Sequence, residues 1–325
     1  MNPPSHPPIE ARRLTKTFDG ITALHDLSLS VAEGELFGLV GPDGAGKTTT
    51  MRILSSILDP DSGDAWVSGF HTVKDAESVK EHIGYMSQRF GLYPDLTVIE
   101  NLEFYADIYG VPRRGPGEKR EEKIDRLLGF ANLAPFRHRR AGALSGGMKQ
   151  KLGLACALVH TPKVLLLDEP TSGVDPVSRR EFWRILNGLL RERVTIFVST
   201  AYLDEAARCH RIALIHQGRL LALGTPADLK RLMRGAILEI RSPEPRRAAR
   251  ALRARFSPEA VGLFGDRVHL VTETPDSAAS EAAAVLRGEQ IETSSIRPVE
   301  PELEDVFVSV LGKEQHPDND PLRSS

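Results

Sequence analysis

A glycine-rich loop constrains the fold of this chain more than any other feature. Residues 41–48 read Gly-Pro-Asp-Gly-Ala-Gly-Lys-Thr and follow an apolar segment, Leu36–Val40. The order predicts a buried strand, a tight loop and a helix over residues 46–58. Glycines let backbone N–H groups curl toward phosphate oxygens, and the helix presents the positive end of its dipole to the same place. The pattern predicts an α/β domain with a phosphate loop; the alternative is a glycine turn with an exposed lysine.

Two acidic residues at the end of an apolar run complete this chemistry. Residues 164–169 read Val-Leu-Leu-Leu-Asp-Glu, which predicts a buried parallel strand whose carboxyl end faces a ligand. Asp168 is expected to hold Mg²⁺, directly or through water, and Glu169 to orient and deprotonate an attacking water. In the glycine loop, Lys47 reaches the β- and γ-phosphates and the Thr48 hydroxyl binds Mg²⁺. The alternative for the acidic pair is a helix N-cap with a spare acid.

Composition excludes several classes of protein. The chain has 325 residues and a formal net charge of −2, so it is long enough for two domains and offers nucleic acid no basic field. No segment reaches the ~18 uninterrupted apolar residues that span a bilayer. Prolines near the N-terminus argue against a signal peptide, and we expect a cytoplasmic chain unless it is tethered. Cys156 and Cys209 are expected to be reduced core thiols.

Changes in composition and in the spacing of apolar residues divide the chain into four regions. Pro-rich residues 1–8 are expected to be disordered, and residues 9–230 alternate apolar runs, glycine turns and amphipathic segments, which is typical of an α/β domain. The polar stretch at residues 112–120 is interpreted as a loop within a helical subdomain. Residues 236–311 predict strand, Arg/Ala-rich helix, two strands, helix, strand and helix, a small α+β domain of ferredoxin-like type. Residues 312–325 are polar and are expected to be disordered.

Local signals predict where some elements begin and what they bury. Asp175 followed by Pro176 predicts a helix start, with a carboxylate at the N-cap and Pro at the first helical position. Residues 60–63 predict a turn before a strand at residues 65–67. The helix after the glycine loop is expected to bury one face, made of Met51, Leu54, Ile57 and Leu58.

A third motif carries a family resemblance. Residues 144–150 read Leu-Ser-Gly-Gly-Met-Lys-Gln, which resembles the ABC signature with Met in the fifth place. The chain resembles the nucleotide-binding subunit of a type-2 ABC exporter, the drug-resistance and ABC-2 permease branch, over residues 9–230 and again at residues 301–307. The resemblance implies a P-loop NTPase cassette of α/β class, with a RecA-like core, an antiparallel β subdomain and a helical subdomain that carries the signature. The small C-terminal α+β domain would follow it.

The resemblance also implies an activity and partners. It implies binding and hydrolysis of ATP with Mg²⁺, coupled to export by separate ABC-2 type permease subunits, at the cytoplasmic face of the cell membrane. In the family the signature of one subunit caps the γ-phosphate bound by the other, so a homodimer or a heterodimer of ATP-binding subunits is implied. Ser145 and the N–H groups of Gly146 and Gly147 would offer phosphate a helix N-terminus. The alternative, a plain helix N-cap, explains the serine but not the two glycines.

Further positions match the family residue by residue. Phe18 falls where the family stacks an aromatic ring on adenine, and the alternative is a core phenylalanine. Gln88 falls where the family's glutamine senses Mg²⁺ and the membrane partner, and the alternative is a surface glutamine. Asp175 lies in a segment that resembles the loop linking the two sites, or it serves only as a helix cap. The residues expected to bind nucleotide are Phe18, Gly41, Pro42, Asp43, Gly44, Ala45, Gly46, Lys47, Thr48, Thr49, Ser145, Gly146, Gly147 and Asp175. The residues expected to act in catalysis are Lys47, Gln88 and Glu169, and the expected Mg²⁺ ligands are Thr48, Gln88 and Asp168.

One departure from the family pattern bears on turnover. The family usually places a histidine after the strand at residues 195–199, but here that position holds Ala201, which has no hydrogen-bonding side chain. His210 and His216 lie at the wrong spacing to replace it. A nucleotide-binding regulatory subunit with weak turnover therefore stays an alternative, although Glu169 argues against it. A soluble ABC ATPase acting on DNA or ribosomes is a further alternative, opposed by the absence of a coiled-coil insertion or a second cassette.

Overall fold

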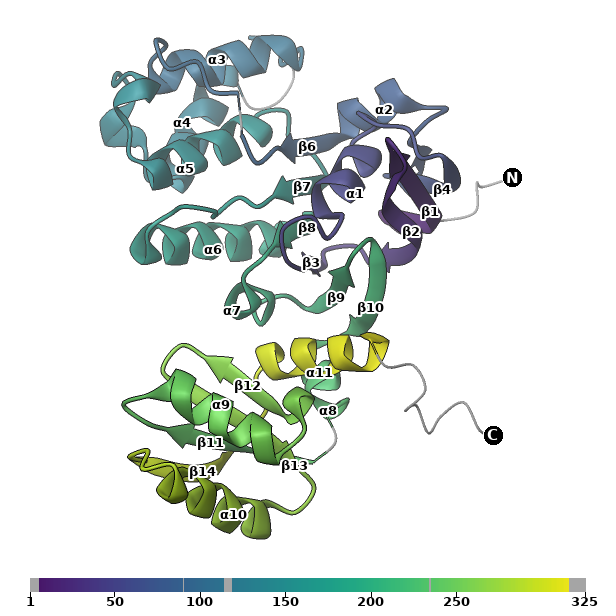
Figure 1. The fold of residues 1–325 in the computed structure, drawn as a ribbon. Coiled ribbons are helices and arrows are strands. Elements are labelled where there is room, and N and C mark those ends of the chain that lie inside the picture. The colour runs from purple at the N-terminus through teal and green to yellow at the C-terminus, as the bar shows by residue number, and fades with distance from the viewer. Residues whose placement is uncertain (1–5, 90, 114–118, 234, 316–325) are drawn as a thin grey trace. The chain divides into compact units, whose positions relative to one another are not determined.

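A computed structural model describes residues 6–89, 91–113, 119–233 and 235–315 of the chain (Figure 1). The chain divides between Leu220 and Leu221 into two compact units, called here the first and second unit. Parts of three sequence predictions lie outside the described residues: the stretches 1–5 and 316–325 of the two expected disordered termini, and residues 114–118 of the expected loop.

A six-stranded sheet forms the core of the first unit. Its order is β10 (Arg219–Gly224), β9 (Arg211–His216), β3 (Leu36–Val40), β8 (Thr195–Thr200), β7 (Val164–Asp168) and β6 (Ile83–Met86). Strand β10 begins in this unit and continues past Leu220. β3 pairs in parallel with β8 and β9, and β7 pairs in parallel with β6 and β8. β3, β7 and β8 are buried along their whole length, as expected for parallel strands covered on both faces. Because the strands are parallel, the chain leaves β3, β7 and β8 at the same edge of the sheet.

Helix α1 (Lys47–Leu54) follows the glycine loop and is shorter than the predicted helix over residues 46–58. Ser55 is its C-cap and Ser56 has a left-handed backbone, with φ of 57°, which turns the chain away from the helix. Met51 and Leu54 are buried, but Ile57 is 58% exposed. The prediction that Ile57 lies on the buried face is therefore wrong, because the helix ends before that residue.

An antiparallel sheet packs beside this core, in the order β2 (Ile21–Val31), β1 (Ile9–Phe18), β4 (Ser62–Val67) and β5 (Phe70–His71). β4 begins at Ser62, earlier than the predicted strand, because Ser62 already pairs with Thr15. Gly63 has φ of 86°, and a Cβ there would lie 2.2 Å from the Arg13 carbonyl oxygen. The expected disorder does not extend to residues 6–8, since the His6 ring stacks on Trp66 at 4.8 Å.

Helices make up most of the rest of the first unit. α3 (Val98–Ile108), α4 (Arg120–Phe130) and α5 (Gly146–Ala157) pack together, and Figure 1 shows them grouped apart from α1. A capping box at Thr97 and Glu100 begins α3. α6 (Pro176–Arg191) begins at the predicted N-cap, Asp175, and packs against α5 and β8. The remaining helical elements of this unit are α2 (Ala76–His82), α7 (Leu203–Ala206), η1 (Ala134–Phe136) and η2 (Ala141–Ala143).

The second unit has the predicted order of elements. After α8 (Pro226–Arg231) come β11 (Ala236–Arg241), α9 (Pro245–Arg255), η3 (Pro258–Ala260), β12 (Val261–Phe264), β13 (Arg267–Thr272), α10 (Pro275–Gly288), β14 (Ser295–Val299) and α11 (Leu303–Gln315). The sheet order β12-β13-β11-β14, with antiparallel neighbours, confirms the ferredoxin-like α+β prediction. Its core joins Leu238 and Val268 of the sheet to Leu252 and Leu286 of the helices. α11 runs to Gln315, past the expected end at residue 311.

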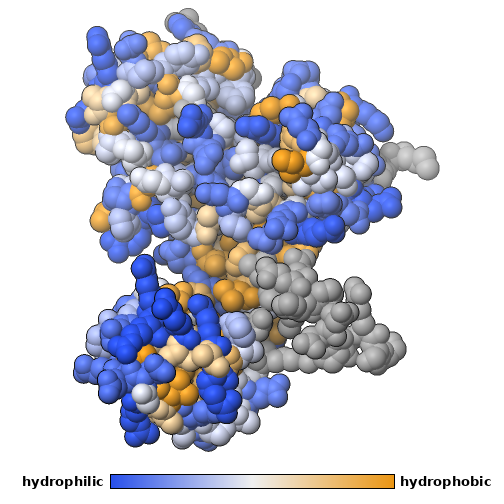
Figure 2. All heavy atoms as spheres, viewed as in Figure 1, coloured by the Kyte–Doolittle hydropathy of each residue, from blue (hydrophilic) through white to orange (hydrophobic). Residues whose placement is uncertain are grey.

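The fold bears on two expectations from the sequence, that the cysteines are core thiols and that the chain has no membrane-spanning segment. Cys156 and Cys209 are both buried and free, and burial raises the pKa of the Cys209 thiol to about 12, so the prediction of core thiols is confirmed. The helices within the described ranges include none with the length and apolar character of a membrane span. Figure 2 shows hydrophilic side chains over much of the visible face of the first unit, with apolar residues scattered among them.

Candidate nucleotide-binding site

The glycine loop approaches neighbouring backbone so closely that only glycine fits at two positions. A Cβ on Gly41 would lie 2.1 Å from the Ile215 carbonyl oxygen, and one on Gly46 would lie 2.6 Å from the Ala23 carbonyl oxygen. Gly46, the N-cap of α1, also has φ of 104°, a conformation that disfavours side chains. The loop is therefore built on backbone contacts, as a phosphate cradle requires.

Lys47 is held inside the loop by three oxygen atoms. Its Nζ donates to the carbonyl oxygens of Gly41, at 2.8 Å, and Pro42, at 2.9 Å. The same Nζ lies 2.9 Å from Glu169 Oε1, and the two side chains are only 3% and 11% exposed. An ammonium group has three donors, so Lys47 is fully paired by the chain itself. The structure thus joins two predicted catalytic residues that lie far apart in the sequence.

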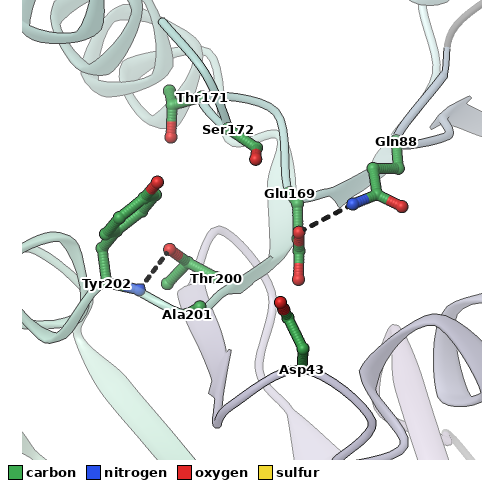
Figure 3. Close-up of a pocket in the computed structure, with 8 residues that line it drawn as sticks. All are labelled: Asp43, Gln88, Glu169, Thr171, Ser172, Thr200, Ala201 and Tyr202. Carbon is green, nitrogen blue, oxygen red and sulfur yellow. Dashed lines mark hydrogen bonds between the residues drawn. The ribbon is translucent and has the colours of Figure 1, made fainter.

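Glu169 is fixed through both its backbone and its side chain. Its backbone lies in the left-handed region, with φ of 49°, a strained state that persists only where neighbours enforce it. Its N–H donates to the Ser199 hydroxyl at 3.0 Å, and Gln88 Nε2 donates to its Oε2 at 2.9 Å (Figure 3). The carboxylate is therefore held by an ammonium group on one oxygen and an amide on the other.

Asp168 is a buried carboxylate with spare capacity. Its Oδ1 accepts a hydrogen bond from the Ser199 hydroxyl at 2.7 Å, whereas its Oδ2 is buried and accepts no hydrogen bond from the described residues. Burial raises the pKa of Asp168, against the lowering effect of the Ser199 and Thr48 hydroxyls. A buried anionic oxygen without a partner needs an explanation, and a hard cation that prefers oxygen ligands would supply one. The residues present therefore fit a Mg²⁺ ligand set at Asp168 and Thr48.

Two cavities flank Glu169. The first, called here the loop cavity, has a volume of about 380 Å³, and the second, the strand cavity, about 370 Å³ (Figure 3). The loop cavity is lined by Ala23, Asp43, Gly44, Gly46, Lys47, Thr48, Thr49, Gln88 and Glu169. The strand cavity is lined by Asp43, Gln88, Glu169, Thr171, Ser172, Thr200, Ala201 and Tyr202. Because both cavities share Asp43, Gln88 and Glu169, the predicted base stands between the phosphate loop and the position of the missing histidine.

The signature residues lie on other elements. Ser145 is the N-cap of α5, where its hydroxyl accepts from the Met148 N–H at 3.3 Å. A Cβ on Gly147 would lie 2.3 Å from the Ser178 Cβ, so this glycine lets α5 approach α6 closely. That contact gives Gly147 a packing reason as well as the predicted one. In the described part of the chain, neither cavity is lined by Ser145, Gly146 or Gly147.

Phe18 and Asp175 also lie outside the cavities' linings, as do the predicted residues Gly41, Pro42, Ala45 and Asp168. Phe18 ends β1 and is 42% exposed, so the alternative of a core phenylalanine is wrong. Asp175 caps α6 by accepting from the N–H groups of Val177 and Ser178, each at 3.0 Å. These backbone hydrogen bonds and the Ser178 side chain lower the pKa of Asp175, as expected for a carboxylate at a helix N-terminus.

Ala201 and its neighbours show what sequence reasoning missed. Ala201 lines the strand cavity, whereas His210 is used elsewhere, where its Nδ1 accepts from the Leu36 N–H at 3.0 Å. Ser199 was not predicted to have a role, yet it bonds to both Asp168 and Glu169. The signal lies in the register: Asp168 on β7 pairs with Ser199 on β8. A hydroxyl residue at the end of a strand is informative only once the neighbouring strand is known.

Fold and site together define a P-loop nucleotide-binding protein: a parallel sheet, a glycine loop leading into α1, and a Lys47–Glu169 pair beside Asp168. The family model described as ABC transporter matches residues 24–172. The chain is also 36% identical to the Nod factor export ATP-binding protein I of Burkholderia pseudomallei (strain 1710b), over 94% of this chain and 98% of that protein. The chain therefore belongs to the ATP-binding proteins of the ABC transporter family, which confirms the resemblance drawn from the sequence.

Other similarities agree with this assignment. The chain is 44% identical over 306 residues to the probable multidrug ABC transporter ATP-binding protein YbhF of Escherichia coli (strain K12), covering 92% of this chain but 51% of that protein. This chain thus spans about half the length of that relative. A dimeric structure of a post-hydrolysis state of the ATP-binding cassette MJ0796, bound to ADP and Pi, matches with a TM-score of 0.60 at 27% identity, over 67% of this chain and 98% of that chain.

Proposed function

We propose that this chain is the ATP-binding and ATP-hydrolysing subunit of an ABC export system. The observation that carries the proposal is the placement of Glu169, paired with Lys47 and hydrogen-bonded to Gln88, between the two cavities. A carboxylate at the edge of a phosphate cradle is positioned to act on water next to the terminal phosphate.

The chain's own side chains suit the two ligands of such a reaction. Lys47 and the loop N–H groups would hold the phosphates of ATP, with Thr49 at the loop cavity. Asp168, through its unpaired oxygen, and Thr48 would hold Mg²⁺, and Gln88 would stand beside them. Mg²⁺, when bound, neutralises charge on the phosphate oxygens.

The Lys47–Glu169 ion pair gives this site a way to sense nucleotide. Each of these two charges satisfies the other, which avoids the cost of an isolated buried ion. Phosphate oxygens compete for Lys47 and would draw it away from the carboxylate. Glu169 is then left with Gln88 on one oxygen and a free oxygen that can accept a proton from water. Binding would in this way prepare the base for hydrolysis.

A second subunit would complete each site. The signature residues and Asp175 are displayed at helix N-termini away from the cavities' linings, so one chain does not bring them to its own loop. The similar cassette MJ0796 is described as dimeric. We infer a head-to-tail dimer in which Ser145 and the glycine N–H groups of one subunit meet the nucleotide on the other. Both a homodimer and a heterodimer with a sister cassette satisfy this geometry.

A role in export is supported by two of the relatives. YbhF is described as a probable multidrug ABC transporter protein and the Burkholderia relative as a Nod factor export protein. We propose that this chain powers separate ABC-2 type permease subunits from the cytoplasmic face of the cell membrane. The net charge of −2 gives no support to a nucleic-acid partner.

One observation favours a second candidate function. Ala201 lines the strand cavity without a side chain that can hydrogen-bond, at the place where the family usually has a histidine. A subunit that binds ATP and turns it over weakly, with a regulatory role, would also fit this site.

A single comparison tests the leading proposal against this alternative. We expect wild type to release phosphate from ATP, and Glu169→Gln to bind ATP with unchanged affinity while its turnover falls by about 10²- to 10⁴-fold, because the amide cannot take a proton. Binding would be measured with a fluorescent ATP analogue and turnover by phosphate release, with the partner permease present. A wild type no faster than Glu169→Gln would leave only the regulatory candidate.

A further inference from the structure

A buried glutamate that lines neither cavity joins two of the segments that do. Glu205 of α7 is fully buried, at 0% exposure. Its Oε1 accepts a hydrogen bond from the Thr171 hydroxyl at 2.5 Å, and its Oε2 accepts one from the Thr200 hydroxyl at 2.7 Å. Since each hydroxyl uses a different carboxylate oxygen, one side chain bridges the segment after β7 and the last residue of β8.

A cation attaches a third element to the same carboxylate. Arg179 of α6 places its Nε 3.4 Å from Glu205 Oε1, and its guanidinium lies 4.3 Å from the centroid of the Tyr202 ring. Tyr202 in turn donates its backbone N–H to the Thr200 hydroxyl at 3.0 Å. A buried carboxylate is retained only when it is paired and hydrogen-bonded, and Glu205 meets both conditions by linking α6, the segment after β7 and the end of β8.

The two bridged segments are the ones that hold the proposed base. Thr171 comes two residues after Glu169. Thr200 follows Ser199, whose hydroxyl bonds to both Glu169 and Asp168. Figure 3 shows Thr171 and Thr200 at the same cavity on different segments, with Glu169 beside them. The strained backbone of Glu169, with φ of 49°, needs surroundings that enforce it, and the bridge joins the segment that follows Glu169 to the strand end that carries Ser199.

We propose that Glu205 is a positioning residue for ATP hydrolysis, an inference that rests on the proposed function above. By fixing the spacing between residues 168–172 and 199–202, it holds Glu169 at the boundary of the two cavities. This matters most at a site where Ala201 contributes no side-chain contact. Glu205 touches no reacting atom itself and acts through Thr171 and Thr200.

The test removes each end of the bridge while keeping side-chain volume. Thr171→Val and Thr200→Val delete one hydroxyl donor each, and Glu205→Gln removes the charge that Arg179 pairs with. Hydrogen bonds to charged groups have effects equivalent to about ten- to a hundredfold in a rate. We expect kcat to fall by about tenfold or more in each variant, while KM for ATP and the affinity for a fluorescent ATP analogue change by less than about threefold.

A second measurement reports on the bridge without any turnover. The N–H groups of Glu169 and Tyr202 are hydrogen-bonded within the bridged segments, so we expect faster amide hydrogen exchange in peptides covering residues 168–174 and 199–204 of the three variants. Exchange in β3 should stay as in wild type, because local opening does not require global unfolding.

Thr195→Val is the matched control. Thr195 is a buried threonine at the other end of β8, where its hydroxyl accepts from the Gly34 N–H at 3.0 Å. Thr195→Val also replaces a hydroxyl by a methyl group and loses one hydrogen bond, but its kcat should equal that of wild type. If Thr195→Val lowers kcat as much as Thr200→Val, or if the Thr171 and Thr200 variants leave kcat and exchange unchanged, the positioning role is overturned. If wild type hydrolyses ATP no faster than Glu169→Gln, the proposed function is overturned. In that case amide exchange still tests the bridge, because unchanged exchange in the Thr171 and Thr200 variants would contradict it.

Discussion

Each unit of this protein buries a glutamate beside a cation at the same distance. Glu169 in the first unit lies 2.9 Å from Lys47 Nζ, and Glu239 in the second unit lies 2.9 Å from an Arg297 guanidinium nitrogen. The carboxylate side chains are 11% and 3% exposed. Distance and burial alone therefore do not separate a site of chemistry from a structural ion pair.

The difference lies in how completely each carboxylate is satisfied. Glu239 pairs with Arg241, Arg267 and Arg297, and these hydrogen bonds, led by the one from Arg241, lower the pKa of Glu239 to about 2. Glu169 has one cation, and its neighbour Asp168 keeps a buried oxygen without a hydrogen bond. A carboxylate surrounded by cations stabilises a fold, whereas a buried carboxylate oxygen without a partner, as at Asp168, leaves room for a ligand.

The largest expected effect is on ATP affinity, and it is tested by removing a cation that pairs with each glutamate. We expect Lys47→Ala to weaken ATP affinity by about a hundredfold or more, because it removes the side chain that pairs with the terminal phosphates and such charged contacts are each worth about 1.5–3 kcal/mol. Arg297→Ala, which removes a cation at the same distance from a glutamate, should leave ATP affinity unchanged. Direct binding of a fluorescent ATP analogue measures both; undiminished affinity in Lys47→Ala would show that the loop cavity is not the phosphate site.

Removing the Glu239 carboxylate should lower the stability of the fold without changing ATP affinity. We expect Glu239→Ala to lower the free energy of unfolding by about 1–3 kcal/mol, because it removes the buried carboxylate that Arg241, Arg267 and Arg297 share. The folded-state pKa of Glu239 is lowered from 4.5 to about 2, so its contribution is present above pH ~4.5 and is lost as the pH falls toward 2. Chemical unfolding at pH 7 and at pH 3 should therefore show a smaller difference from wild type at pH 3.

Asp168→Asn is the control, because its expected effect on the free energy of unfolding is opposite to that of Glu239→Ala. Burial raises the pKa of Asp168, so folding disfavours its charged form relative to the unfolded chain, and its contribution to stability is lost as the pH rises through that pKa. At pH 7 without nucleotide, the amide should leave the unfolding free energy unchanged or raise it. If Asp168→Asn destabilises the chain as much as Glu239→Ala does, the two carboxylates do not differ as described.

A smaller effect is expected from restoring the family's usual side chain in the strand cavity. Ala201→His would add one hydrogen-bonding group beside Glu169. We expect kcat to rise by about tenfold, with little change in ATP affinity, because the contact would form best as the γ-phosphate departs. Ala201→Leu adds comparable bulk without a donor and should not raise kcat. Steady-state ATPase rates, with Glu169→Gln as the blank, distinguish these outcomes, and an equal rise in both variants would point to cavity filling.

The smallest effect should follow from removing the second unit. Among the residues that the structure describes, none that lines the loop cavity lies beyond Glu169, so we expect a chain ending after about residue 230 to bind ATP within about twofold of the full chain. Such a chain should fail in regulation or assembly with the permease. Isothermal titration of both chains with ATP provides the measurement. A truncated chain that folds but does not bind ATP would show that the second unit contributes to the nucleotide site.

Short-range patterns in the sequence were sufficient for the parts of the protein that local chemistry controls. The glycine loop at residues 41–48, the Asp168–Glu169 pair after an apolar strand, and the Asp175–Pro176 helix start are all read within a few residues. The order of elements in the second unit followed from periodicity in the same way. The helix after the glycine loop was predicted too long, because apolar spacing continued to Ile57 after the backbone had turned at Ser56.

The tertiary structure alone decided which of these residues meet. The Lys47–Glu169 pair, the Ser199 hydroxyl between Asp168 and Glu169, and the Glu205 bridge each join segments well separated along the chain. Their contact depends on the order β3-β8-β7 in the sheet, and parallel strands are joined by long crossovers that leave this order open in the sequence. Local spacing thus determined the chemistry available to this protein, and strand order, set by burial of the whole core, determined which side chains share a site.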